Sequence, residues 1–312
     1  MTAPTSSSQR TVLLITHTGR RAAVEVATAV ADRLVAEDMK VRVLADEASE
    51  LAIPAADVVD SHGAADNCEL AVVIGGDGTI LRGAALTRQP GTPLLGINLG
   101  HVGFLAEAEW EDLESTVEAI IAGGYAVEER LTIDVVVRLN GQVLSEEWAL
   151  NEASIEKAGR QRIIEVIVEI DDRPLSRWGC DGVVVSTPTG STAYAFSAGG
   201  PVVWPEVEAL LMVPISAHAL FARPLVAPPT STLAVELLPH SSAGLLSCDG
   251  RRTVDLPPGT RIEVRRGKFP VRLARLHRAG FTDRLVAKFG LPVSGWRGAA
   301  EMRAIDGRPP GA

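Results

Sequence analysis

The stretch Ala71–Arg82, AVVIGGDGTILR, decides the fold of this 312-residue chain. A run of apolar, mostly β-branched residues leads into a glycine-rich turn, and a helical pattern begins directly after it. A strand, a tight turn and a helix in this order are the unit of a parallel sheet covered by helices. Glycines let the backbone come close to a phosphate, and the N–H groups at the helix start can donate to that anion. We therefore predict an α/β domain with an anion site at this turn.

Asp77 lies in the middle of the turn, where a carboxylate would repel phosphates unless it orients a metal or takes a proton. An aspartate that takes the proton of an attacking hydroxyl is the usual base of phosphoryl transfer. We therefore predict a kinase with Asp77 as the general base, and with Gly75, Gly76, Thr79 and Arg82 beside the phosphate donor. The alternative is an ordinary strand-to-helix turn in which Asp77 or Thr79 only caps the helix.

Two common phosphate-binding motifs are missing from the sequence. No GxxxxGK followed by Ser or Thr occurs, so the chain is not a P-loop enzyme, and no GxGxxG follows the first predicted strand. The phosphates must be held in another way.

The rest of the chain divides around this turn. From residue 11 to about 128, short apolar runs alternate with helical patterns, which indicates an α/β domain with a parallel sheet. From 129 to 280, apolar and polar residues alternate with period two between Gly, Asn and Pro turns, which indicates a mainly antiparallel, all-β domain. Residues 281–298 should form a helix that packs back on the first domain. The ends, 1–10 and 299–312, are predicted to be disordered.

The amino-acid composition limits the possible binding partners and the cellular compartment. The net charge of −9 argues against nonspecific binding to nucleic acid or to an anionic membrane. The short clusters Arg251-Arg252 and Arg265–Lys268 are predicted to be solvated hairpin surface. Three cysteines without CxxC spacing, and no signal or membrane segment, indicate a cytoplasmic protein in a reducing compartment.

Three further segments are candidates for function: Gly96–Phe104, the pair Asn151-Glu152, and Asp181–Pro201, which contains DGVVVSTPTGSTAY. In the last segment a strand ends in a hydroxyl-rich loop ordered by Pro and Gly, which could form a pocket for a purine and a ribose. An amide beside a carboxylate is a suitable pair for vicinal ribose hydroxyls. The alternative is a set of helix caps, a core tyrosine and a polar pair on an edge strand.

Taken in this order, GGDGT, Asn-Glu and DGVVVSTPTGSTAY resemble the NAD kinase family, and the resemblance extends from Thr11 to about Arg297. It implies phosphorylation of the 2′-hydroxyl of the adenosine ribose of NAD to give NADP. The donor would be ATP with Mg²⁺ or another divalent cation, or inorganic polyphosphate, with the metal carried by the donor phosphates. It also implies a homo-oligomer, a dimer or a tetramer, whose site is completed by a neighbouring subunit.

The resemblance also assigns residues. Asp77 is the implied base, and the implied NAD-binding residues are Gly78, Phe104, Asn151, Glu152, Asp181, Thr192, Ala193, Tyr194 and Ser197. Where the family often has a basic residue before Asp181, this chain has Trp178-Gly179-Cys180, so the cross-subunit phosphate contact has no assigned residue. Asp249-Gly250 follows the family pattern too, but Asp-Gly is the default two-residue hairpin turn, and a structural role is predicted for it.

Two rival functions remain open from sequence. GGDGT also occurs in lipid kinases and in phosphofructokinases, although the DGVVVSTPTGSTAY segment and Asn151-Glu152 argue against them. A nucleotide sensor without turnover would need the pocket but would have no use for Asp77.

Overall fold

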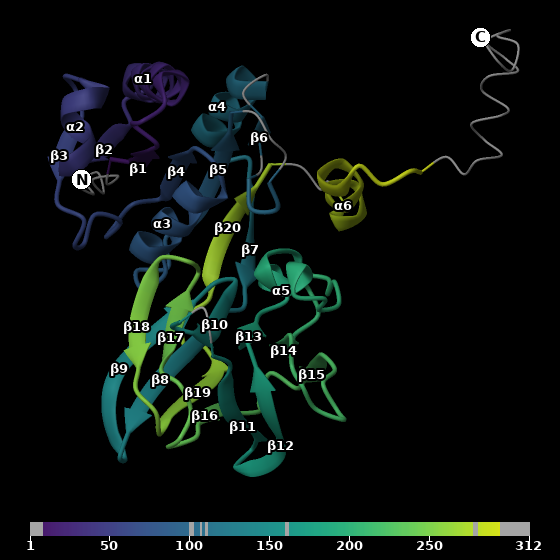
Figure 1. The fold of residues 1–312 in the computed structure, drawn as a ribbon. Helices are drawn as coiled ribbons and strands as arrows, with labels where there is room; N and C mark the ends of the chain where they lie inside the picture. The colour runs from purple at the N-terminus through teal and green to yellow at the C-terminus, as the bar shows by residue number, and fades with distance from the viewer. Residues whose placement is uncertain are drawn as a thin grey trace, which may run out of the picture.

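The structure is a computed structural model that describes residues 9–99, 103–106, 108–109, 112–159, 162–276 and 280–293. Most of the predicted N-terminal arm, residues 294–298 and the whole predicted C-terminal tail lie outside the described residues. Figure 1 shows two parts, one made of strands and helices and one made almost wholly of strands.

The described helices are α1 (Arg21–Ala36), α2 (Ala45–Leu51), α3 (Asp77–Thr87), α4 (Leu113–Ala122), α5 (Tyr194–Ser197), α6 (Phe281–Phe289) and the 3₁₀ helix η2 (Thr189–Thr192). The strands of the first part are β1 (Thr11–Thr16), β2 (Lys40–Leu44), β3 (Asp57–Val59), β4 (Leu70–Ile74), β5 (Leu94–Asn98), β6 (Ala108–Glu109), β7 (Ala126–Arg130) and β20 (Val271–Arg275). Those of the second are β8 (Ile133–Leu139), β9 (Gln142–Ala149), β10 (Glu152–Lys157), β11 (Ile164–Ile170), β12 (Arg173–Cys180), β13 (Gly182–Ser186), β14 (Leu210–Ile215), β15 (Leu225–Ala227), β16 (Leu233–Leu237), β17 (Gly244–Cys248), β18 (Arg252–Leu256) and β19 (Thr260–Arg266).

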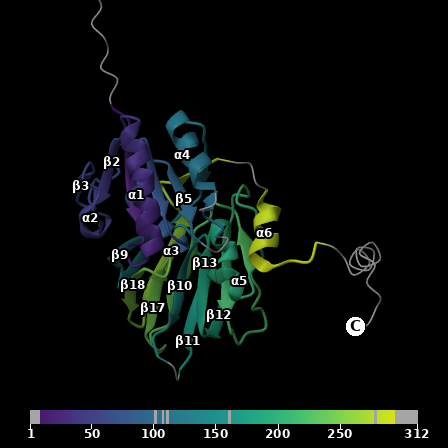
Figure 2. The same ribbon diagram turned by 90° about the horizontal axis from the view of Figure 1, so that it is seen from above.

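The first part is a mostly parallel sheet in the order β3-β2-β1-β4-β5-β20-β7, with β6 beside β5. Each of β1 and β4 is buried along its whole length because helices cover both faces of the sheet. On one face α1 and α4 close one apolar core, and on the other α3 closes a second (Figure 2). The strand order turns back between β1 and β4, which is where ligands bind in open α/β sheets.

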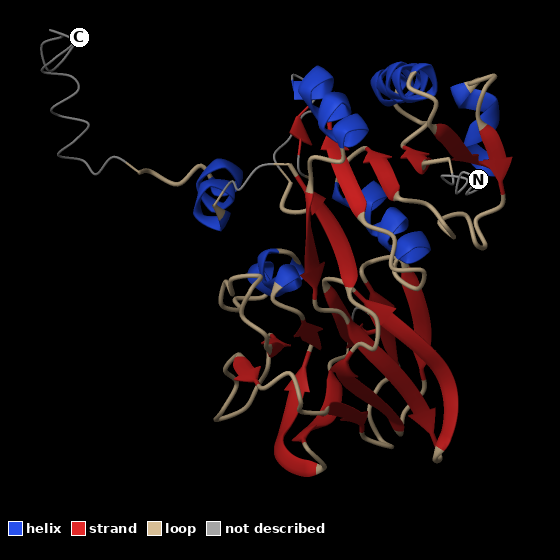
Figure 3. Ribbon diagram, turned by 180° about the vertical axis from the view of Figure 1, so that it is seen from behind, coloured by secondary structure: helices blue, strands red, loops and turns tan. Residues whose placement is uncertain are grey.

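The second part is a sandwich of two antiparallel sheets, β15-β14-β13-β10-β17-β18 and β12-β11-β16-β19-β8-β9. Alternate residues of the two sheets face one another and form a single buried core that includes Trp178. Figure 3 shows this part as an almost continuous block of strands below the helices. The predicted fold class, a parallel α/β domain followed by a mainly antiparallel all-β domain, is confirmed.

The two parts share a core. Ile80, Leu81 and Ala84 of α3 belong to the same buried cluster as Leu150, which lies between β9 and β10 of the sandwich. Leu150 immediately precedes Asn151 and Glu152. This packing therefore fixes the position of Asn151 and Glu152, the predicted NAD-binding pair, relative to the helix that begins at Asp77.

Two elements near the C-terminal end differ from the sequence-based division. β20 falls within the predicted range of the all-β domain, yet it pairs with β5 and β7 and completes the first sheet. Strand patterning shows that Val271–Arg275 is extended, but it does not show which sheet the strand joins.

Helix α6 contacts both parts. Arg284 donates to the main-chain carbonyls of Phe104 and Ala106, and the Phe289 ring stacks on Phe196 of the second part with centroids 4.5 Å apart. Helix α6 therefore contacts the first part, where packing was predicted, and the second part as well. No helix within the described ranges is both long and apolar enough to cross a membrane.

Candidate active site

The glycine-rich turn begins where β4 ends. The Gly75 N–H donates to Ile97 O at 2.9 Å, and Gly75 has a φ of +154°, which an L side chain rarely adopts. A Cβ on Gly75 would lie 2.5 Å from Thr79 Oγ1. At Gly76 and Gly78, by contrast, an added Cβ would meet nothing within 4 Å. Gly75 is therefore required by the turn itself, whereas the other two glycines leave open space beside it.

Asp77 is the first residue of α3, and the N-cap is Gly76, so the cap is neither Asp77 nor Thr79. Its carboxylate accepts hydrogen bonds from the main-chain N–H groups of Phe104 and Leu105. Gly103 approaches so closely that an added Cβ would collide with Asp77 Oδ1. That oxygen is buried and has no hydrogen-bond partner among the described residues. A buried acceptor without a partner is costly unless a ligand satisfies it, so this atom is a candidate for chemistry.

The electrostatic surroundings of Asp77 suit a base. Burial raises the pKa of its carboxyl group, and the positive charge of Lys288 opposes that rise. A raised pKa brings a carboxylate closer to neutral pH, where a general base is most effective.

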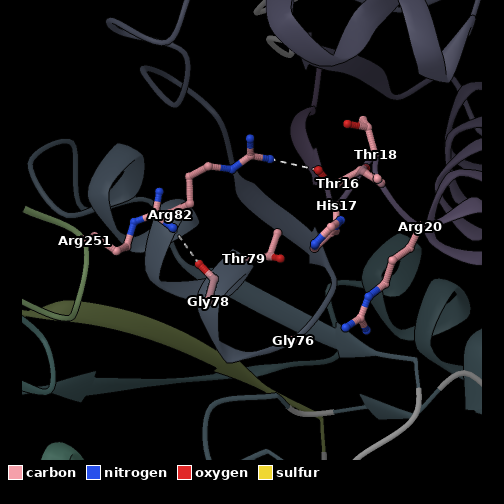
Figure 4. A pocket seen from close by; sticks show the side chains of 10 residues that line it. Thr16, His17, Thr18, Arg20, Gly76, Gly78, Thr79, Arg82 and Arg251 are labelled. Atoms are coloured by element: carbon pink, nitrogen blue, oxygen red, sulfur yellow. Dashed lines mark hydrogen bonds between the residues drawn. The ribbon is translucent and has the colours of Figure 1, made fainter.

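A basic cavity of about 530 Å³ lies on one side of the turn (Figure 4). Its walls are the loop Thr16–Arg20 after β1, the glycine turn, Arg82 of α3 and Arg251 of the β17–β18 turn. Arg82 Nη2 donates to Thr16 O at 2.9 Å, and Arg251 Nη1 donates to Gly78 O at 3.1 Å. Three guanidinium groups from three separate elements thus surround the open backbone of the turn, an arrangement suited to a polyanion.

A second cavity of about 530 Å³ shares Arg20 and Gly76 with the first and contains Asp77, Asn98, Leu99, Gly103 and Lys288. Asp77 therefore lies at the boundary between a basic cavity and a second space. Lys288 reaches this space from α6, whose position depends on aromatic contacts such as Phe104 with Phe289, 5.8 Å between ring centroids.

The predicted pair Asn151-Glu152 forms a turn between β9 and β10 that is held by one buried side chain, Asp249. Asp249 Oδ1 accepts the N–H groups of Asn151 at 2.7 Å and Glu152 at 3.3 Å, and Oδ2 accepts the N–H of Leu150 at 2.9 Å. We name this arrangement, Leu150 to Glu152 with Asp249, the acceptor corner. The structural role predicted for Asp249 is confirmed. Its side chain also accepts hydrogen bonds from three main-chain N–H groups of another turn.

Glu152 is almost fully buried in the acceptor corner. Burial, and next the charge of Asp249, raise its pKa to about 8, while a hydrogen bond from the Tyr194 N–H opposes the rise. Its Oε2 has no partner within the described part of the chain. At neutral pH this carboxyl group therefore carries its proton and can both donate and accept a hydrogen bond.

The other predicted residues fall into two groups. Tyr194 donates its hydroxyl to Glu156, and Asp181 pairs with Lys157 on β10. Ala193 and Ser197 lie close to Tyr194 in the chain. The main-chain N–H of Tyr194 contacts Glu152, so this group of residues adjoins the acceptor corner. Phe104 and Thr192 line a third cavity, of about 430 Å³, between the two parts of the molecule. Gly78, predicted on the NAD side, borders the basic cavity together with Gly76, Thr79 and Arg82.

Sequence reasoning missed several groups near the turn. Arg251 is exposed on the β17–β18 hairpin turn, as predicted, but it also donates to Gly78 O and lines the basic cavity, which the sequence did not indicate. Its neighbour Arg252 lies 4.7 Å from the Trp148 ring centroid and pairs with Glu147 and Asp249. No sequence feature around Lys288 indicated a functional role. Its position near Asp77 depends on packing between segments that are far apart in the chain.

The fold and the site define a two-domain kinase without a P-loop, in which a glycine turn at the edge of a parallel sheet faces a β-sandwich. Comparison with known proteins narrows this class. The model of the ATP-NAD kinase N-terminal domain matches residues 12–125, and that of the C-terminal domain matches residues 150–276. The chain belongs to the NAD kinase family and is an enzyme of that family.

Individual relatives agree over almost the whole chain. NAD kinase 2 of Streptomyces coelicolor is 62% identical over 300 residues, which covers 95% of this chain and 99% of the relative. NAD kinase of Thermobifida fusca is 57% identical over 307 residues, covering 95% and 94%.

Among solved structures, an NAD kinase from Archaeoglobus fulgidus in complex with ATP is 26% identical, with a TM-score of 0.67 and coverage of 91% and 100%. Yeast NADH kinase complexed with NADH, 24% identical, has a TM-score of 0.84 and coverage of 92% and 89%, which supports the fold.

Proposed function

We propose that this protein transfers the terminal phosphoryl group of ATP to the 2′-hydroxyl of the adenosine ribose of NAD and so makes NADP. The observation that carries the proposal is the position of Asp77. Its Oδ1 is buried without a described partner at the boundary between the basic cavity and the space that contains Asn98 and Lys288. The family assignment then supplies the identity of the two substrates.

The donor phosphates would occupy the basic cavity. The open backbone at Gly76 and Gly78 admits phosphate oxygens, and the N–H groups in the first turn of α3 favour an anion there. Arg20 and Arg251 would neutralise donor charge, and Arg82 would donate N–H groups to it. The structure of the Archaeoglobus NAD kinase contains ATP, which supports ATP as the donor. Inorganic polyphosphate would be a second donor.

Asp77 would act as the general base. The 2′-hydroxyl gives its proton to the Asp77 carboxylate while its oxygen attacks the terminal phosphorus, and the bond from that phosphorus to the bridging oxygen breaks so that ADP leaves. Lys288 beside Asp77 would keep the carboxylate ionised before transfer.

The acceptor corner would hold the dinucleotide. Protonated Glu152 and the amide of Asn151 together offer donors and acceptors for ribose hydroxyls. Tyr194 offers an aromatic face beside them, and Ala193, Ser197, Asp181, Thr192 and Phe104 would complete the binding surface.

A divalent cation would bind at this site only together with the phosphate donor. Within the described residues no three or more His, Cys, Asp or Glu side chains gather as a metal site. The cation, Mg²⁺ in our proposal, would therefore be held by the donor phosphates, beside the turn that contains Asp77. When bound it would neutralise phosphate charge.

The active protein would be a cytoplasmic homo-oligomer. Exposed apolar side chains between β14 and β15, such as Leu220 and Phe221, would be covered by a neighbouring subunit. Light scattering coupled to size exclusion should give more than one chain per particle at micromolar concentration, and a fully active monomer would contradict it.

An acceptor screen tests the proposed function. The purified protein is given Mg²⁺ and either ATP or polyphosphate, with NAD, NADH, diacylglycerol or fructose 6-phosphate, and the phosphorylated form of each acceptor is detected by mass spectrometry. We expect turnover with NAD. Turnover only with the lipid or the sugar phosphate would overturn the proposal, as would tight NAD binding without any turnover.

A further inference from the structure

We infer that Glu47, a buried carboxylate on α2, is a positioning residue that holds two walls of the basic cavity in the geometry needed to bind the phosphate donor. The inference rests on the proposed function, because it assumes that this cavity takes the donor phosphates. Nothing in the sequence pattern distinguishes Glu47 from its solvated neighbours Asp46 and Glu50.

The burial of Glu47 is the first reason. It is 1% exposed, whereas Asp46 and Glu50 on the same short helix are exposed. Moving a carboxylate out of water is expensive unless charged or hydrogen-bonding partners compensate. A glutamate at this position therefore needs partners, and the structure provides two.

The partners, Thr16 and Arg82, belong to two different elements that line the cavity. Glu47 Oε2 accepts the main-chain N–H of Thr16 at 2.8 Å, at the start of the loop Thr16–Arg20. Glu47 Oε1 accepts a hydrogen bond from Arg82 Nη2, and the same nitrogen donates to Thr16 O at 2.9 Å. One carboxylate thus connects the loop after β1, helix α2 and helix α3 in a closed ring of hydrogen bonds.

This ring decides which parts of Arg82 remain for the donor. Nη2 is occupied twice, while Nη1 has only a longer contact of 3.8 Å to Asp46 among the residues that the structure describes. A free arginine would lose rotamer freedom on binding a phosphate, and an arginine already fixed by two hydrogen bonds would lose less. Glu47 would therefore improve donor binding although its own charge is negative.

The charges around the cavity agree with separate roles for Arg82 and Glu47. Glu47 offsets the charge of Arg82, so the net positive charge toward the donor comes from Arg20 and Arg251. Arg82 would contribute directed N–H donors, and Glu47 would set their direction. Glu47 itself does not line the cavity, which separates a positioning role from a binding role.

Glu47→Gln tests the inference because it keeps the volume and removes the charge. The amide can still accept from Arg82, but its NH₂ group would then face the Thr16 N–H. We expect the KM for ATP to rise roughly tenfold, as for the loss of a charge-assisted hydrogen bond, with the NAD dissociation constant within about twofold of wild type.

Two control variants and a double-mutant cycle test whether the effect is specific to Glu47 and acts through Arg82. Glu50→Gln is the same change on an exposed position of α2, and Asp46→Asn removes the exposed carboxylate near Arg82. Both should leave the KM for ATP within about twofold, since exposed pairs contribute little. If Glu47 acts through Arg82, the double variant Glu47→Gln with Arg82→Gln should bind ATP no worse than Arg82→Gln alone.

The contradicting outcomes are distinct. A folded Glu47→Gln with an unchanged KM for ATP, or additive effects in the cycle, would overturn the inference. If Glu47→Gln does not fold, Glu47→Asp replaces it, since the shorter side chain keeps the charge but cannot reach both partners. A wild-type KM for ATP in Glu47→Asp would then overturn it. Wild-type protein that makes no NADP would instead contradict the proposed function.

Discussion

The basic cavity and the acceptor corner both contact α3 and are built in opposite ways. The cavity is lined by a contiguous glycine turn, by a loop and by arginines. The corner is built from the β9–β10 turn and the β17–β18 turn, and its buried side chains are the carboxyl groups of Glu152 and Asp249. One half of the site is rich in guanidinium groups and open backbone, and the other in buried carboxyl groups.

This difference reflects what each half has to bind. A polyanionic donor needs positive charge and short approaches to main-chain N–H groups, which glycines permit. Buried carboxyl groups would repel phosphates but suit the hydroxyl groups of a ribose. Asp77 lies in the glycine turn at the boundary of the basic cavity, and it is the carboxylate to which we assign the chemistry. The following predictions separate the two halves.

The largest effect is expected at their boundary. Asp77→Asn keeps the shape of the turn and removes the carboxylate that receives the proton, so kcat should fall by roughly a hundred- to ten-thousand-fold. NAD binding, measured by calorimetry, should change little, and ATP should bind more tightly because a negative charge is gone. If most turnover survived, Asp77 would not be the base.

The next effect is expected in the acceptor corner alone. Asp249→Asn weakens the hydrogen bonds to the N–H groups of Leu150, Asn151 and Glu152, so the KM for NAD should rise roughly ten- to hundredfold, as for the loss of charge-assisted hydrogen bonds. The KM for ATP should stay within about twofold. Asp255→Asn, the same change at an exposed position of β18, is the matched control. An equal rise in both KM values would show that the two halves are not separable.

A smaller effect is expected from Lys288, whose charge opposes the raised pKa of Asp77. Lys288→Gln removes that charge, so the pKa of Asp77 rises further and less carboxylate is ionised at a given pH. The acidic limb of the kcat profile should move to higher pH, with a rate loss of about threefold to tenfold below the limb. Lys288→Arg should restore the wild-type profile. An unmoved limb would place Lys288 outside the reach of the base.

The smallest effect concerns the stability of the acceptor corner. The pKa of Glu152 is raised to about 8 in the folded protein from the ordinary value of 4.5. Between these values the folded state binds more protons than the unfolded state, so this residue makes stability fall as pH rises from 4.5 to about 8.

Glu152→Gln removes that dependence, because the amide does not ionise. The melting temperature at pH 8.5 should therefore rise by about 3 °C relative to wild type, while the difference should vanish near pH 4.5. A lower melting temperature at pH 8.5 would mean that the ionised carboxylate has a partner that stabilises it.

The two halves were not equally predictable from sequence. Asp77 and its glycines lie in one contiguous stretch, and an apolar run before such a turn fixes both the strand and the helix. Asp249 supports Asn151 from a separate hairpin, and Arg251 reaches Gly78 from the same turn. Asp-Gly is also the default hairpin turn, so its sequence could not reveal these contacts. Glu47 was hidden for a related reason, because Asp46 and Glu50 beside it are ordinary exposed acids.

The central claim is that Asp77 directs a phosphoryl group from the basic cavity to one particular hydroxyl of NAD. The most direct test is to isolate the product formed by wild-type protein from NAD, ATP and Mg²⁺ and to locate the new phosphate by ³¹P NMR. The account predicts one new phosphomonoester signal coupled to the proton on the 2′-carbon of the adenosine ribose. A phosphate on another hydroxyl, or ATP consumed without any phosphorylated dinucleotide, would contradict it.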